Sequence, residues 1–165
     1  MHVFAATWLA VVLAAIAAPS PPQSSMADLR ARFEHEPNPV QKAKLMQSLG
    51  DAEFVELRKH VENGEFPDAL NLYRKYRDET QACIKALDGA KLDAEKHPNG
   101  FKQLEFSLQE SLRRLDMLLP GMTQDDQAPF LDVRKDIEEM HRHVIEELFP
   151  DKASPGPKAE KPKAE

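Results

Sequence analysis

The densest group of potential metal ligands lies near the C-terminal end, in the run EEMHRHVIEE at residues 138–147. Glu138 and His141 are three residues apart, and His143 and Glu147 are four apart, so on a helix each pair shares a face. Carboxylate-bridged di-iron bundles use the first spacing, but they need it on two helices and a further Glu on each of two others. This chain has one copy, and the same run is typical of a solvated helical face with charge pairs. We therefore predict no metal site, with these four residues as the only candidates for one.

No other spacing points to catalysis. Glu56 with His60 and Asp93 with His97 repeat the four-residue interval, but in a chain with 30% charged residues such pairs arise by accident. The sequence lacks the HExxH, CxxCH, P-loop and GxGxxG motifs, and nothing places a serine on a nucleophile elbow. We predict a protein that is not an enzyme and that uses no cofactor.

The first residues resemble an export signal. Residues 3–18 carry no charge, and Ala15-Ile16-Ala17 supplies the small-x-small pattern of a signal-peptidase site. We predict a signal peptide at residues 1–17, a flexible linker at 18–26, and a periplasmic or secreted product without a stable membrane span. The positive charge that usually precedes such a segment is missing, so translation from Met26 and a cytoplasmic product is the alternative.

The charge balance limits the partners. The formal net charge is −6 and no basic cluster is visible, which argues against nucleic acid as a partner. The single cysteine, Cys83, cannot form a disulfide within the chain. It falls on the apolar side of its predicted helix and should be a small core residue, with pairing between two chains as the alternative.

The elements that position these residues are helices. Apolar residues recur at alternating intervals of three and four in residues 101–119 (FKQLEFSLQESLRRLDMLL), between the helix-stopping stretches HPNG and PG. The same alternation, as in a coiled coil, predicts helices at 67–97 and 129–149, and shorter ones at 27–36, 40–49 and 52–62. Gly50 should separate the last two, with Asp51 as an N-cap.

The resulting prediction is an all-α domain at residues 27–150. Three long helices form an antiparallel bundle, and a shorter N-terminal helical hairpin at 40–63 packs against its end or side. Residues 151–165 are rich in Pro, Lys, Ala and Glu and have no large apolar residue, so we expect a disordered tail.

Two resemblances accompany this prediction. Gly64, Phe66, Ala69 and Tyr73 match the second helix of a tetratricopeptide repeat, but only one half-repeat is present, and such arrays need about three copies. The order of export signal, helical hairpin and the helix FKQLEFSLQESLRRLD is similar to a family of uncharacterised secreted α-helical proteins of soil bacteria, over residues 29–150. That resemblance implies a fold and export, and no activity or site residues.

The function indicated is that of a protein-interaction or structural module of the cell envelope, which binds a protein partner or self-associates. The alternative is a bundle that binds a metal or small ligand through His141, His143 and the neighbouring carboxylates.

Overall fold

The structure, a computed structural model, describes residues 25–150, which form five α-helices and a short 3₁₀ turn. The helices are α1 (Met26–His35), α2 (Pro39–Glu62), α3 (Phe66–Gly89), α4 (Asn99–Leu118) and α5 (Gln124–Leu148), and the turn η1 (Leu119–Gly121) joins the last two. No strand occurs in this range, so the all-α prediction is confirmed. The predicted signal peptide, all but the end of the linker and the tail at 151–165 lie outside the described residues.

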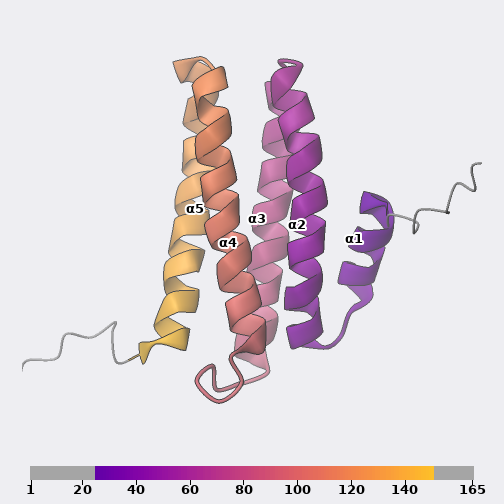
Figure 1. Cartoon of the computed structure of the whole chain (residues 1–165), viewed down its shortest axis with the longest axis vertical. Coiled ribbons are helices and arrows are strands. Elements are labelled where there is room, and N and C mark those ends of the chain that lie inside the picture. The colour runs from indigo at the N-terminus through magenta and orange to yellow at the C-terminus, as the bar shows by residue number, and fades with distance from the viewer. Residues whose placement is uncertain (1–24, 151–165) are drawn as a thin grey trace, which may run out of the picture.

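Four long helices share one core, and α1 lies against the outside of α2 (Figure 1). Helix α2 packs on α3 and α4, and α5 packs on the same two helices. Consecutive helices α3 and α4 therefore lie across the bundle from each other. Helices α2 and α4 run in one direction and α3 and α5 in the other (Figure 1). The bundle thus consists of two antiparallel hairpins, α2–α3 and α4–α5, with like-directed helices adjacent.

The predicted hairpin at 40–63 is wrong, because α2 is one continuous helix of 24 residues. Asp51 is therefore not an N-cap; the N-cap is Asn38, whose Oδ1 accepts hydrogen bonds from the backbone N–H groups of Val40 and Gln41. Gly50 lies inside the helix at a close helix contact, since a Cβ there would lie 2.9 Å from Cε2 of Tyr76. As a result, α2 is a full member of a four-helix core, and the predicted three-helix core is corrected.

Two other helix limits differ from the prediction. Helix α3 ends at Gly89 instead of near residue 97, because Lys91 takes a left-handed conformation with φ 51° and Asp93 Oδ1 accepts the N–H groups of Glu95 and Lys96. Helix α5 begins at Gln124, so the loop predicted at 120–129 is shorter.

The start of α5 is set by its cap. The Thr123 hydroxyl accepts the Asp126 N–H at 3.3 Å. Gln127 Nε2 donates to the carbonyl oxygens of Leu119 and Met122 at 2.9 and 3.1 Å, which closes the turn between α4 and α5. Pro129 then lies inside the helix instead of at its start.

The core follows the predicted inward faces. Tyr73 and Tyr76 of α3 are buried and stack with ring centroids 6.4 Å apart, and Phe54 meets both edge-on. Cys83 is fully buried, which confirms its prediction as a core residue. The buried stripes of the other helices also agree, and they include Phe33, Met46, Leu57, Leu104, Leu108, Leu115, Phe130, Val133, Ile137 and Val144.

None of the helices within residues 25–150 combines the length and the apolar character needed to cross a membrane.

Candidate functional site

An open cleft of about 790 Å³ runs between the parallel helices α2 and α4. Its walls carry Val55 from α2 and Met117 from α4, each with 59% of its surface exposed. About three helical turns before Met117 on α4, the half-exposed Phe106 lies at the mouth of a smaller adjoining hollow. We call this surface the α2/α4 cleft. It joins large exposed apolar side chains to a concave surface, as ligand and partner sites commonly do.

Arg114 occupies the middle of the α2/α4 cleft. Its Nη2 lies 2.6 Å from Asp51 Oδ1 on α2, and its Nε lies 2.8 Å from Glu110 Oε1 on its own helix. The guanidinium carbon is 5.7 Å from the centroid of the Phe54 ring, at cation–π distance. The side chain thus ties α4 to α2 and fixes a cation at the centre of the cleft.

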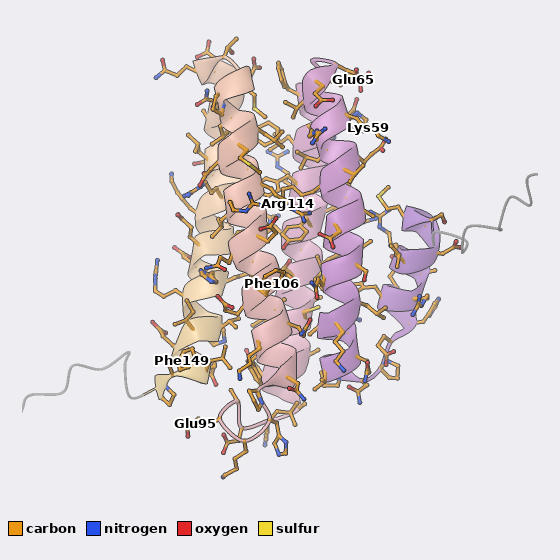
Figure 2. The ribbon with its side chains drawn as sticks, in the orientation of Figure 1. Lys59, Glu65, Glu95, Phe106, Arg114 and Phe149 are labelled. Carbon is orange, nitrogen blue, oxygen red and sulfur yellow. The ribbon has the colours of Figure 1, made fainter. Side chains whose placement is uncertain are left out.

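Further cations accompany Arg114 in the lining of the cleft. Arg113 shares the Glu110 carboxylate, and hydrogen bonds from Arg113 and Arg114 lower the pKa of Glu110 to about 2. Arg58 on α2 pairs with Glu62 at 2.9 Å. Figure 2 shows Phe106 and Arg114 at successive levels of α4, with Lys59 of α2 nearer the end of the bundle. These exposed pairs are weak, because solvent screens them.

The small hollow beneath Phe106 measures about 20 Å³ and reaches inward to Gly50 and Tyr76. The Tyr76 hydroxyl donates to the Ser107 carbonyl oxygen at 3.0 Å, which fixes the ring beside the glycine. The inner end of the cleft therefore has a rigid floor where α2, α3 and α4 meet.

A second groove, of about 650 Å³, runs between α3 and α5. Its lining is mostly charged, and Arg77 bridges the two helices by a 3.0 Å contact with Asp136. None of the large apolar side chains exposed in residues 25–150 lies in it. This groove therefore lacks the large exposed apolar side chains that distinguish the α2/α4 cleft.

The structure separates the four residues considered for a metal. His141 Nε2 lies 3.1 Å from Glu105 Oε1 on α4, whereas His143 Nε2 lies 3.3 Å from Asp88 Oδ2 on α3. Glu138 forms an ion pair with Arg134, and Glu147 is exposed. No group of three or more His, Cys, Asp or Glu side chains that could hold a metal ion occurs between residues 25 and 150.

The sequence analysis missed a buried charged cluster under α1. Arg30 Nη2 of α1 lies 2.5 Å from Glu53 Oε1 of α2, and its Nε lies 3.3 Å from Glu79 Oε1 of α3. Glu53 is only 1% exposed. Burial, and next the charge of Glu79, raise the pKa of Glu53 to about 8 against the opposing effect of Arg30.

A signal for this cluster was present in the sequence. When 39–62 is taken as one helix, Ala43, Met46, Gly50, Glu53 and Leu57 follow the same alternation of four and three, and Glu53 is the only charged residue in that stripe. The predicted break at Gly50 interrupted the stripe and hid it.

Comparisons with known proteins give no further guide, since no protein-family model, curated protein or solved structure matches this chain. Both resemblances, to a tetratricopeptide half-repeat and to secreted helical proteins of soil bacteria, stay predictions.

Proposed function

We propose that this chain is an exported, non-enzymatic interaction module that binds a protein partner along the α2/α4 cleft. The apolar N-terminal segment with its small-x-small pattern supports the export part of the proposal. The surface of the bundle supports the binding part.

The observation that carries the binding proposal is the placement of exposed apolar side chains. Three of the six large ones in residues 25–150, Val55, Phe106 and Met117, belong to the α2/α4 cleft. Concentration of such side chains around a groove is typical of a surface that a partner covers. Arg114 fixes a cation in the middle of the cleft, and the exposed Arg58 and Arg113 form a polar rim.

This chemistry suits an amphipathic helix as the partner. A helix laid into a groove contributes apolar anchors one turn apart. Carboxylates flanking those anchors would meet Arg58, Lys59 and Arg113, each of which is more than half exposed. The rim charges would then set the orientation of the bound helix, and the apolar anchors would provide most of the binding affinity.

Photo-crosslinking in the cells that make the protein tests the proposal. A photoreactive amino acid at position 117 should capture one discrete partner, whereas the same group at Leu131 on α5, which is also exposed but lies outside the cleft, should not. Phe106→Asp should abolish the product formed from position 117, and Leu131→Asp should leave it unchanged. A product with twice the mass of the chain would identify the partner as a second copy.

Equal products from positions 117 and 131, or no product from either, would contradict binding at the α2/α4 cleft. The export part is tested separately by the mass of the mature chain. A chain that begins near Ala18 supports signal cleavage, and a chain that begins at Met26 in the cytoplasm refutes it.

A further inference from the structure

Helix α1 is held to the bundle by a small number of contacts. It has ten residues, which is fewer than an isolated helix needs to be stable in water, so its structure depends on docking. Phe33 is its one buried residue, and the Lys42 ammonium of α2 lies 4.7 Å from the centroid of that ring. Met26 and Leu29 add partly buried apolar contacts, and Arg30 makes two ionic contacts with α2 and α3.

Arg30 spans the two carboxyl groups that face α1. Its guanidinium contacts Oε1 of Glu53 at 2.5 Å and Oε1 of Glu79 at 3.3 Å. The second oxygen of each carboxyl group is buried and has no hydrogen-bond donor within the described residues. Buried polar atoms are nearly always paired, because an unpaired one costs about 1–3 kcal/mol.

Other charged and titratable groups around this pair leave its charge unbalanced. They come from four helices: Arg30 of α1, Lys42 of α2, Glu79, Tyr76 and Cys83 of α3, and Arg114 of α4. Burial raises the pKa of Tyr76 and of Cys83 to about 12, so both are neutral. Arg114 is already paired with Asp51 and Glu110. The Lys42 ammonium lies over the Phe33 ring. Within residues 25–150, the two acids therefore pair with one cation, Arg30.

A single proton would balance the charge of this cluster. The carboxyl groups of Glu53 and Glu79 contact the same guanidinium, and each keeps one buried oxygen without a donor. A proton on Glu53 would leave one negative charge opposite Arg30. The buried cluster would then be neutral, which burial favours.

We propose that α1 is a proton-dependent clasp: it docks through Arg30 while the buried Glu53 carboxyl group holds a proton, and rising pH weakens its docking. This inference concerns the α1 side of α2 and is independent of the partner proposed for the α2/α4 cleft.

The direction of the pH effect on docking depends on whether the docked or the released state of α1 binds the proton more tightly. With α1 docked, desolvation is the largest influence on Glu53 and its pKa is about 8. Release of α1 removes desolvation, which raises the pKa of Glu53, and Arg30, which lowers it; because desolvation is the larger influence, the pKa falls toward its ordinary value of 4.5. Docking is therefore strongest below the released-state pKa, weakens as pH rises between the two values, and levels off above the docked-state pKa.

Hydrogen–deuterium exchange of the full chain tests this clasp. The protection factors of the α1 amides, corrected for intrinsic exchange, should fall by up to about tenfold per pH unit between about pH 5 and pH 8. In Glu53→Gln they should be nearly constant and should match the wild type near pH 5, because an amide resembles a protonated carboxyl group but cannot ionise. Amides in the middle of α3 provide the internal reference.

Two variants complete the design. Glu56→Gln changes a neighbouring, partly exposed carboxylate that pairs with Lys59, and it should keep the wild-type pH dependence. Arg30→Gln should leave α1 unprotected at every pH. Equal α1 protection at pH 5 and pH 8 in the wild type would overturn the proposal, as would loss of α1 protection at pH 5 in Glu53→Gln. If Glu53→Gln does not fold, Glu79→Gln takes its place: it removes the neighbouring charge that helps to raise the pKa of Glu53, so the loss of α1 protection between pH 5 and pH 8 should be smaller than in the wild type, and an unchanged loss would overturn the proposal.

Discussion

At the scale of single residues, the contact between Gly50 and Tyr76 determines how closely α2 and α3 approach. A Cβ at position 50 would lie 2.9 Å from Cε2 of Tyr76. The tyrosine ring is buried, and its hydroxyl is bonded to the Ser107 carbonyl oxygen. The ring therefore has little freedom to move, and the missing side chain at position 50 is what allows the contact.

Gly50→Ala should therefore destabilise the protein in spite of the higher helix propensity of alanine. We expect the free energy of unfolding to fall by about 1–3 kcal/mol, as for other overpacked cores. Gly89→Ala is the matched control, because no atom lies within 4 Å of its Cβ position, and it should be neutral or stabilising by up to about 1 kcal/mol. Denaturant unfolding of both variants measures the difference, and equal stabilities would contradict this account of Gly50.

Cys83 gives a second prediction at this scale. It is fully buried, and burial raises the pKa of its thiol to about 12, so the reactive thiolate is scarce and inaccessible. A thiol reagent at neutral pH should modify Cys83 at least about 100-fold more slowly in the folded protein than in denaturant. A cysteine introduced at the exposed Ser48 should react rapidly in both states. A disulfide-linked dimer of the wild type, the alternative considered from the sequence, would contradict this prediction.

At the scale of helices, the inward faces could be predicted from the sequence, but three limits could not. Periodicity places Phe101, Leu104 and Leu108 in the core because burial and helix geometry act on the same residues. In contrast, a glycine inside a helix cannot be distinguished by sequence from one at a helix end until its neighbour across the interface is known. The predicted break at Gly50 was wrong for this reason, and that break also hid the buried position of Glu53.

The limits of α3 and α5 depend on side chains that bond to the backbone. After the end of α3, the Asp93 carboxylate accepts hydrogen bonds from the N–H groups of Glu95 and Lys96. The Thr123 hydroxyl caps α5 six residues before Pro129. The sequence contains both residues, but it does not show which of the Asp, Ser and Thr side chains will bond to a helix end. The spacing of the metal candidates shows which residues share a helix face, but it does not show their partners on other helices. His141 contacts Glu105 of α4, whereas His143 contacts Asp88 of α3.

The N-cap of α2 can be tested directly. Asn38 Oδ1 accepts the N–H groups of Val40 and Gln41 at 3.0 and 3.1 Å. Asn38→Ala should lower the free energy of unfolding by about 1 kcal/mol. Asn38→Asp keeps an acceptor oxygen and adds a favourable charge at the helix N-terminus, so its stability should equal or exceed that of the wild type. A similar loss of stability in both variants would show that the side-chain cap does not account for the contribution of Asn38.

At the scale of the whole molecule, α2 connects the two surfaces described here. It packs against α1, α3 and α4, carries Glu53 toward α1, and contributes Phe54 and Val55 to the α2/α4 cleft. Because a close-packed interior transmits strain, both sides of the bundle depend on how α2 packs. Both proposed sites therefore depend on the position of α2.

The buried acid also gives the whole molecule a distinctive pH dependence. In the folded state the pKa of Glu53 is about 8, raised from 4.5 chiefly by burial, so the folded protein keeps a proton that the unfolded chain loses. The stabilisation is complete below the unfolded value and disappears as pH rises through the folded one. This carboxyl group alone should lower the free energy of unfolding by up to about 1.4 kcal/mol per pH unit in that window.

Denaturant unfolding of Glu53→Gln and the wild type across about pH 5 to pH 8 isolates this contribution. The two proteins should be similar at the acidic end, and the variant should be the more stable one at the alkaline end, since its amide cannot ionise. Glu110 cannot produce this pattern, because Arg113 and Arg114 lower its pKa to about 2, and its effect is confined to strongly acidic solution. A constant deficit in the variant at every pH would instead mean that Glu53 is ionised in the folded protein and that its bond to Arg30 is an ordinary buried salt bridge.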